Sequence, residues 1–522
     1  MTTDEKLAEL DGGSKEARTS SFSLIQEGLQ KSPDKPALIV AHQPAEHLSG
    51  LLDSNDDDVK QTRSNGDSTK TCFTWTYTQL HHASLKLVNG MFACNIRPKM
   101  TIVTLIPNSA EWALILWTSV FFRTTLSSVD PGALSQPRRD ELVNFLVTLT
   151  PDVIVVPDAE GAKAVDEALQ AANTILPLLR LTLADSASET WKSLVDVATA
   201  DIPQQIDEEG LTRAALTDDP DRTSLILFTS GTSSGKPKGC PRSVRVTAFA
   251  TEFAFLGPRD NTTTRALISS ANFRIIAPMR MLSTWSHGGV NVVINVASAP
   301  NILDAAEQHR ITHLILFPAV VHAVAADPKL QQRDLSSVTC VGSGGDIITK
   351  SLLHKMKATF PTAINYIGHG MTEGGCIVRW SWAQTPLEQL PYFGEIAPLG
   401  RIAVGAKVRV WNTEERRVAK RGEPGELHLC SPGMITHYLG HTNKDAFITG
   451  DDGTPWFNTG DLGMIDDDGN VFILGRIKDV MKRAAIPITP AALESCIVTL
   501  TGEQVSVPIT SHMKSRELTP SR

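Results

Sequence analysis

The sequence lacks the marks of several large protein classes. Its seven cysteines include no Cys-x-x-Cys pair, which argues against a disulfide framework or a zinc site. No apolar run is long enough to cross a bilayer, and the longest, residues 112–122, is typical of a buried helix. No Lys/Arg-rich block accompanies the net charge of −8, so nucleic acid is not an expected partner. Because the chain also begins without a signal or transit peptide, we expect a reduced, cytoplasmic protein with no transmembrane segment.

What the sequence does contain is a long alternation of strand-like and helix-like segments. The chain has 522 residues, 41% of them apolar and 20% charged, which is typical of a globular protein with more than one domain. From residue 73 to about 400, apolar runs alternate with helix-length segments, as 101–109 does with 110–122. This alternation predicts an α/β fold of layered, mostly parallel sheets with helices. Short strands between Gly, Pro, Asp and Asn turns predict a small β-barrel-like subdomain at about 400–475.

The same texture predicts the limits of the domains. Residues 1–20 are expected to be a disordered tail, and the polar stretch 43–72 an exposed loop insertion. The main N-terminal domain is expected to span 21–475, including the β subdomain. Residues 476–522 are expected to form a hinge and the remnant of a C-terminal domain, because about 100 residues are needed for an ordinary domain.

One loop carries the first functional signal. Residues 225–240 read LILFTSGTSSGKPKGC, so a buried strand runs directly into a loop of small polar residues. The loop is not a P-loop of the GxxxxGK[ST] type, because only three residues separate Gly231 from Gly235 and Pro237 follows the lysine. A surface linker is the alternative, but linkers rarely follow directly on a buried strand. Backbone N–H groups, hydroxyls and Lys238 predict a phosphate site.

Four motifs in order resemble one family. These are the loop TSGTSSGKPKG (229–239), YIGHGMTEGG (366–375), GELHLCSPGMITHYLG (425–440) and WFNTGDLGMIDDDGNVFILGRIKDVMK (456–482). Together they resemble the adenylate-forming enzymes, which comprise acyl-CoA synthetases, luciferases and the adenylation domains of peptide synthetases. The loop is one residue longer than the family pattern. The resemblance spans about residues 21–494 and identifies the main domain as an AMP-binding domain.

The resemblance implies an activity and its cofactors. Such enzymes convert a carboxylic acid and ATP, with Mg²⁺, into an acyl-adenylate and pyrophosphate, and then pass the acyl group to a thiol. The acceptor is CoA or the phosphopantetheine of a carrier protein. The chain is accordingly expected to be an acid–thiol ligase. Its departures from the family pattern at His369, Arg274 and Ala485 indicate a specialised, secondary metabolism.

The resemblance also implies a nucleotide site. Asp461 matches the carboxylate that accepts both ribose hydroxyls, and Arg476 a second ribose contact, with a surface turn or salt bridge as the alternative. His369 stands where the family usually places an aromatic ring on adenine, so weaker stacking is expected. The residues implied to bind the nucleotide are Thr229, Ser230, Gly231, Thr232, Ser233, Ser234, Gly235, Lys238, His369, Gly370, Met371, Thr372, Asp461 and Arg476.

Three residues match the family's catalytic groups. Glu373 matches the carboxylate that holds Mg²⁺, a hard oxygen ligand for a hard cation. Thr372 would donate to the α-phosphate, and Lys238 would neutralise developing negative charge.

The acid pocket departs from the family pattern. In SSANFRIIAP (269–278), Arg274 stands in the place of a histidine; it would pair with a substrate carboxylate or polar group, or point to solvent. Gly344 and Gly345 match the glycine-rich strand end that flanks the acyl group. No Asp for an α-amine is evident, so a fatty or aromatic acid is expected rather than an amino acid.

The C-terminal segment departs further. Lys478 matches the hinge about which the family's small C-terminal domain rotates. Ala485 replaces a Gly on the path of the pantetheine arm, and Ala492 replaces a Glu. The near-terminal lysine of the family is unmatched, since neither Lys482 nor Lys514 has the right context. Two alternatives therefore stand beside an active ligase: a degenerate nucleotide- or acyl-binding protein, and a half-enzyme that needs a partner domain.

Overall fold

The structure is a computed structural model whose described part covers most of the chain. It describes residues 6–16, 18, 20–52, 72–174, 177–184, 188–202, 205–229, 237–253, 261–375, 377–441 and 444–479, and the backbone of 481–483 and 486–488. Within these ranges, no helix combines the length and apolar character that a membrane span requires.

The first sheet has seven strands in the order β10-β9-β5-β4-β6-β7-β8. All neighbours are parallel except β9 and β10. The strands are β4 (Thr101–Thr104), β5 (Thr125–Ser128), β6 (Val153–Val156), β7 (Leu179–Thr182), β8 (Lys192–Ser193), β9 (Thr223–Phe228) and β10 (Gly239–Ser243). The helices beside them in the chain are α3 (Tyr77–Ala93), α4 (Ala110–Phe121), α5 (Arg139–Leu149), α6 (Ala159–Ala172), α7 (Leu194–Thr199), α8 (Glu208–Leu216) and α9 (Val244–Phe253).

The second sheet also has seven strands, in the order β15-β14-β13-β11-β12-β2-β3, and only β2 and β3 are antiparallel. The strands are β2 (Pro36–Pro44), β3 (Cys72–Thr76), β11 (Arg265–Ile268), β12 (Val290–Val293), β13 (His313–Leu316), β14 (Cys340–Gly344) and β15 (Ile364–Gly368). Its helices are α1 (Ser21–Lys31), α10 (Ile276–Ser286), α11 (Ala299–Gln308), α12 (Pro318–Ala325) and α13 (Lys350–Thr359).

The third sheet is antiparallel and has nine strands, in the order β1-β20-β22-β24-β25-β19-β18, with β21 on β20 and β23 on β24. These are β1 (Glu9–Asp11), β18 (Val378–Arg379), β19 (Gly400–Ile402), β20 (Lys407–Asn412), β21 (Arg417–Val418), β22 (Gly425–Cys430), β23 (Phe447–Thr449), β24 (Pro455–Ile465) and β25 (Asn470–Arg476). Two small hairpins stand apart: β16 (Gly370–Met371) with β17 (Gly374–Gly375), and β26 (Met481–Arg483) with β27 (Ile486–Ile488).

Short 3-10 helices complete the described elements. They are η1 (Ser49–Leu51), η2 (Pro131–Leu134), η3 (Gln136–Arg138), η4 (Leu330–Gln332), η5 (Leu387–Gln389), η6 (Leu439–His441), η7 (Lys444–Ala446) and η8 (Ile477–Asp479).

Local sequence explains why these elements form where they do. The central strands β5, β6 and β12 are short and buried at all four positions, which is typical of strands covered on both faces. Side chains at helix starts satisfy the free backbone N–H groups: Ser109 accepts from the N–H of Trp112 at the start of α4, and Thr349 from that of Leu352 at the start of α13. The expected layers of mostly parallel sheets with helices are confirmed.

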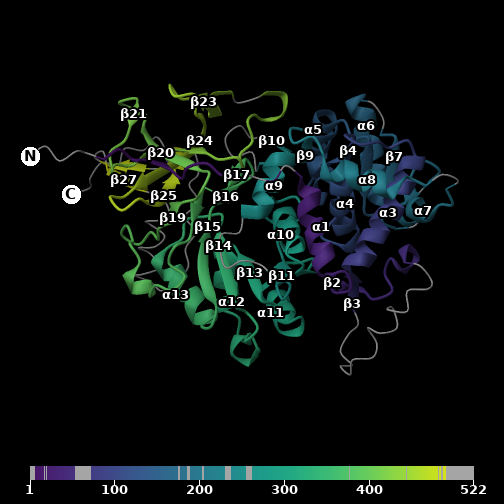
Figure 1. Cartoon of the computed structure of the whole chain (residues 1–522), viewed down its shortest axis with the longest axis horizontal. Helices are drawn as coiled ribbons and strands as arrows, with labels where there is room; N and C mark the ends of the chain where they lie inside the picture. The colour runs from purple at the N-terminus through teal and green to yellow at the C-terminus, as the bar shows by residue number, and fades with distance from the viewer. Residues whose placement is uncertain are drawn as a thin grey trace, which may run out of the picture.

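The sheets pack side by side through two large apolar cores. One core joins Ile102 and Val153 of the first sheet to Leu38 and Val293 of the second. The other joins the second sheet to the antiparallel sheet. Figure 1 shows the result: the blue to teal first sheet, the second sheet with its green strands β11 to β15, and the green to yellow antiparallel strands follow one another across the molecule.

The start of the chain differs from the expectation of a disordered tail over residues 1–20. Residues 9–11 form β1, which pairs antiparallel with β20. Ala8 beside it is fully buried, and its N–H donates to the carbonyl of Ala419 at 2.8 Å. The expectation is wrong for this segment, because an edge strand offers unpaired backbone groups that even a polar peptide can pair with.

Candidate active site

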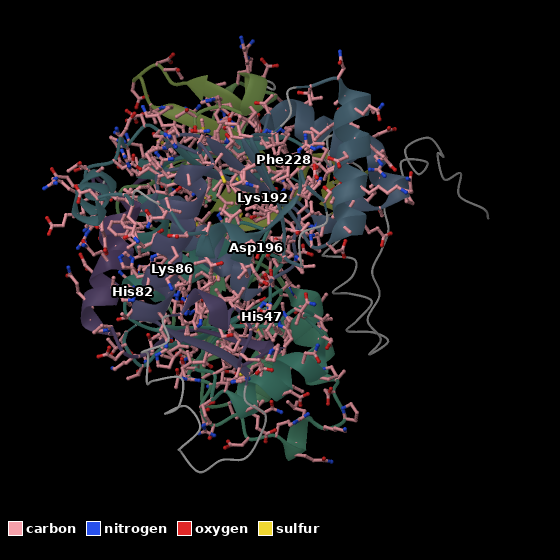
Figure 2. The ribbon with its side chains drawn as sticks, turned by 90° about the vertical axis from the view of Figure 1, so that its right-hand side faces the viewer. His47, His82, Lys86, Lys192, Asp196 and Phe228 are labelled. Atoms are coloured by element: carbon pink, nitrogen blue, oxygen red, sulfur yellow. The ribbon has the colours of Figure 1, made fainter. Side chains whose placement is uncertain are left out.

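The base of the phosphate loop is an antiparallel strand pair. Phe228, the last residue of β9 and labelled in Figure 2, lies opposite Gly239, the first of β10. Its ring packs on Phe145 with centroids 4.7 Å apart. Between the two strands, the N–H of Thr229 donates to the carbonyl of Lys238 at 3.0 Å, and the N–H of Lys238 to Oγ1 of Thr229 at 3.2 Å. These bonds hold both ends of the loop together.

The rest of the predicted loop site falls outside the described residues. This applies to Ser230, Gly231, Thr232, Ser233, Ser234 and Gly235, whose roles stay predictions. Thr229 and Lys238 are the loop residues whose placement contributes to the geometry below.

The YIGHGMTEGG motif folds into a tight hairpin at the carboxyl end of the second sheet. β15 ends at Gly368, and β16 then pairs with β17, leaving Thr372 and Glu373 as the turn between them. A Cβ on Gly374 would lie 2.7 Å from the carbonyl oxygen of Gly433, so glycine is required for this close approach. The hairpin brings both predicted catalytic residues to one tip.

A buried arginine holds this tip against the antiparallel region. Arg242 of β10 is 1% exposed and donates to the carbonyls of Thr372 and Gly433, each at 3.3 Å. The N–H of Ile435 donates to the carbonyl of Glu373 at 2.8 Å. The phosphate-loop strand, the hairpin and residues 431–438 are therefore one connected assembly. Sequence reasoning missed Arg242, which stands in the short segment GCPRS directly after the phosphate loop.

Glu373 has one oxygen engaged and one available. Its Oε1 accepts a hydrogen bond of 2.6 Å from the hydroxyl of Tyr438. Burial and the neighbouring carboxylate raise the pKa of Tyr438 well above its ordinary value. Its Oε2 accepts no hydrogen bond from the described residues. Within the described part of the chain, no three His, Cys, Asp or Glu side chains gather as a metal cluster. A single protein carboxylate suits Mg²⁺ that takes its other ligands from phosphates and water.

His369 lies between β15 and the hairpin as a neutral ring. Burial and the nearby Arg476 guanidinium lower the pKa of His369 to about 4. Its Nδ1 is buried and makes no hydrogen bond with any described residue. A neutral imidazole fits a heteroaromatic base, because it offers a π-face without a charge.

The predicted ribose pair lies inside the antiparallel sheet. Asp461 of β24 stands directly opposite Arg476 of β25, and Oδ1 of Asp461 lies 3.0 Å from Nε of Arg476. Arg476 also donates to the carbonyl of Thr459 at 3.1 Å. Burial raises the pKa of Asp461 to about 6, and the Arg476 charge offsets this only in part.

The two parts of the nucleotide site are electrostatically coupled. Arg476 contributes to the lowered pKa of His369, and Glu373 contributes to the raised pKa of Asp461. Coulomb effects of this kind require charges within a few ångströms to about 10 Å. The hairpin of the second sheet and the β24–β25 ladder of the third therefore lie near one another.

The predicted glycines of the acid site lie beside this space. Gly344, at the carboxyl end of β14, pairs with Gly368, whose carbonyl oxygen would lie 2.1 Å from a Cβ on Gly344. Gly345 has φ +87°, and the ring of Phe317 lies over it, 40% exposed. Both residues therefore need to be glycine, and an aromatic face borders them at the same sheet edge.

A small cavity adjoins the same edge, between β11 and α10. Arg280 of α10 is 4% exposed and lines it, whereas Arg274 does not. Arg274 is exposed, with its guanidinium carbon 5.5 Å from the ring of Phe273. Arg280 was missed, although a charge amid the apolar α10 was a signal. The lining residues are Leu267, Ile268, Ser269, Ser270, Ile276, Ala277, Arg280 and Ile315.

The hinge region is described only at its start. Lys478 lies in η8, directly after β25, and its predicted hinge role is not tested by this placement. Ala485 and Ala492 lie outside the described residues.

Comparison with known proteins agrees with the motifs. The family model of AMP-binding enzymes matches residues 54–439. An acyl–CoA ligase of Pestalotiopsis microspora, GME11374, is 38% identical over 97% of this chain and 86% of its own length. The 4-coumarate–CoA ligase 3 of Arabidopsis thaliana is 25% identical over 81% of this chain and 72% of its own.

Solved structures share the fold. The luciferase-like enzyme from the nonluminescent Zophobas morio mealworm superposes with a TM-score of 0.71 at 20% identity, over 91% of this chain and 100% of that one. The anthranilate CoA ligase AuaEII, in complex with anthranoyl-AMP, superposes with a TM-score of 0.73 at 18% identity, over 94% and 84%. With its motifs gathered at one site and a family match over most of its length, the chain belongs to the AMP-binding enzymes.

Proposed function

We propose that this chain activates a carboxylic acid with ATP and transfers the acyl group to CoA. The observation that carries the proposal is that Lys238 and Glu373 meet at Tyr438 while the Asp461–Arg476 pair lies near His369 and Glu373. The 38% identical relative bears the name of an acyl–CoA ligase, which favours CoA over a carrier protein as the acceptor.

The nucleotide would be oriented from two sides. The neutral His369 ring offers a face to adenine, and Asp461 offers a carboxylate to the ribose hydroxyls. Hydrogen bonds to a charged group contribute about 1.5–3 kcal/mol each, which is enough to favour one orientation of the nucleotide strongly. Arg476 keeps the Asp461 carboxylate in place through the cross-strand contact at 3.0 Å.

The first chemical step is the attack of the acid's carboxylate oxygen on the α-phosphorus. The new P–O bond forms as the bond to pyrophosphate breaks, and acyl-AMP results. Thr372 would donate to the α-phosphate and Lys238 would bind the phosphate oxygens that gain charge. Glu373 would hold Mg²⁺, which supplies further neutralisation of phosphate charge when bound.

In the second step the sulfur of CoA attacks the acyl carbonyl carbon. The C–O bond to AMP breaks, AMP leaves with its phosphate oxygen, and the thiol proton is released. Lys478 would act as the hinge about which a C-terminal segment rotates between the two steps.

A fatty or aromatic acid is the proposed substrate class. Phe317 and the glycines Gly344 and Gly345 would border the acyl chain at the strand ends.

The test is acid-dependent exchange of pyrophosphate into ATP, measured across matched fatty, aromatic and amino acids. Exchange with at least one non-amino acid, abolished by Glu373→Ala, supports the proposal. CoA-dependent release of AMP with the same acid supports the second step.

Two results would favour the alternatives. Nucleotide binding without exchange for any acid would indicate a degenerate binding protein. Exchange that appears only after a C-terminal domain of a related ligase is supplied in trans would indicate a half-enzyme.

A further inference from the structure

We propose that Tyr438 is a positioning residue that holds the metal-binding carboxylate and the phosphate-loop lysine in register. The inference rests on the proposed assignment of Glu373 to Mg²⁺. It concerns a side chain that touches both groups but no reacting atom.

Tyr438 is built into the assembly around the hairpin. Its side chain is 3% exposed, and its ring packs edge-on against Phe447 at 5.4 Å between centroids. The preceding residues are anchored by the contacts of Gly433 with Arg242 and of Ile435 with the carbonyl of Glu373. The ring therefore has little freedom, and its position is independent of any ligand.

From this fixed position the ring contacts two opposite charges. Its hydroxyl donates to Oε1 of Glu373 at 2.6 Å, and Nζ of Lys238 lies 5.1 Å from the ring centroid. These residues come from two different elements, the hairpin turn and the base of the phosphate loop. A cation over an aromatic face at this distance is attracted by the ring.

The consequence for a metal follows from the free oxygen. With Oε1 engaged by the phenol, Oε2 is the oxygen of Glu373 that remains for a cation, so the carboxylate would bind it through one oxygen. A ligand whose orientation is fixed beforehand loses less entropy on binding. Loss of a residue that hydrogen-bonds to a metal ligand typically lowers metal affinity or activity by about 10–100-fold.

The experiment measures metal binding without turnover. Mn²⁺ is titrated into the full chain in the presence of a non-hydrolysable ATP analogue, and free Mn²⁺ is followed by electron paramagnetic resonance. Tyr438→Phe, which keeps the ring and the Lys238 contact, should raise the Kd of Mn²⁺ about tenfold. Tyr438→Leu, which loses both contacts, should also weaken binding of the analogue itself.

Tyr77→Phe is the matched control. Tyr77 is also buried, and its hydroxyl donates to the carbonyl of Gly289 at 2.6 Å, but it packs between α3 and α10. Its loss should lower thermal stability and leave the Kd of Mn²⁺ unchanged. A purely structural role for Tyr438 would give the same pattern.

The outcomes separate this inference from the proposed function. Equal Mn²⁺ affinity in the wild type and Tyr438→Phe would overturn the inference even if acid-dependent exchange is found. A weakened Kd in Tyr438→Phe, in a wild-type chain that exchanges pyrophosphate with no acid, would support the inference while the proposed function fails. No Mn²⁺ binding by the wild type would overturn the inference, because Glu373 would then hold no metal.

Discussion

The second and third sheets contribute to the same site in different ways. In the parallel second sheet, the candidate groups lie beyond the strand ends: His369 follows β15, and Glu373 lies in the turn of the β16–β17 hairpin. In the antiparallel third sheet, Asp461 and Arg476 lie within two paired strands and face each other in register.

The difference teaches how each group is held. Asp461 and Arg476 are positioned by the β24–β25 ladder in which they pair, by their own salt bridge, and by the bond from Arg476 to the carbonyl of Thr459. A residue in a turn has no ladder, so side chains must hold it. Arg242 and Tyr438 do this for the hairpin, and both come from elements far away in the sequence.

The largest expected effect is on the turn. Glu373→Gln keeps the shape and an oxygen that accepts from Tyr438, but removes the charge. Acid-dependent pyrophosphate exchange should fall by about 10²–10³, as when a charge-stabilising group is removed from a transition state. Exposed Glu388→Gln is the control and should leave the rate unchanged. A comparable loss in the control would refute a specific role for Glu373.

The next effect concerns the strand ends that precede the turn. Gly344→Ala places a Cβ 2.1 Å from the carbonyl oxygen of Gly368, so β14 and β15 must separate. We expect the free energy of unfolding to fall by about 1–3 kcal/mol, as for other overpacked sites. Gly368→Ala is the control, since its Cβ would meet nothing nearer than 3.9 Å. Denaturant unfolding measures both variants. Equal losses of stability in Gly344→Ala and Gly368→Ala would contradict the proposed clash between β14 and β15.

A smaller expected effect is the pH dependence that Asp461, in the β24–β25 ladder, gives to nucleotide binding. Because the pKa of Asp461 is about 6, its carboxyl takes up a proton below that pH, and nucleotide affinity should fall by up to about tenfold per pH unit. Stability should respond in the opposite sense. The pKa is raised above the ordinary 3.8, so this group's contribution to stability is fully present below pH 3.8 and is lost as pH rises through 6.

Asp461→Asn is the variant that isolates this pH dependence. It should remove the pH step in AMP binding between pH 5 and 7, measured by calorimetry, and weaken binding at pH 7.5 by about tenfold or more. A pH step that persists in Asp461→Asn would assign it to another group.

The smallest expected effect is at adenine. The pKa of His369 is about 4, so the ring is neutral above pH 5 and should add no pH step of its own there. His369→Tyr enlarges the stacking face, and stacking contributes about 1–3 kcal/mol per base, so a few-fold gain in AMP affinity is expected from the added area. Weaker binding would indicate that another property of the imidazole matters more than the area of its face.

Much of this protein follows from local sequence. The alternation of apolar runs and amphipathic segments predicted the parallel sheets, because a strand covered on both faces must be apolar throughout, as Val153–Val156 is. The motifs also located His369, Glu373, Asp461 and Arg476, since each stands in a short pattern whose spacing is fixed within one turn or one strand pair. The β1 edge strand escaped prediction because its pairing with β20 comes from backbone groups.

What only the tertiary structure decided is how these segments meet. Tyr438 and Glu373 lie 65 positions apart, and Arg242 and Gly433 lie 191 apart, so no local pattern links them. The choice of Arg280 over Arg274 as the residue that lines the cavity depends on the direction in which α10 packs on β11. The sequence by itself determined the mostly parallel sheets and the identity of the candidate groups. Their convergence was decided by the packing of three sheets, because contacts between distant segments depend on the whole core.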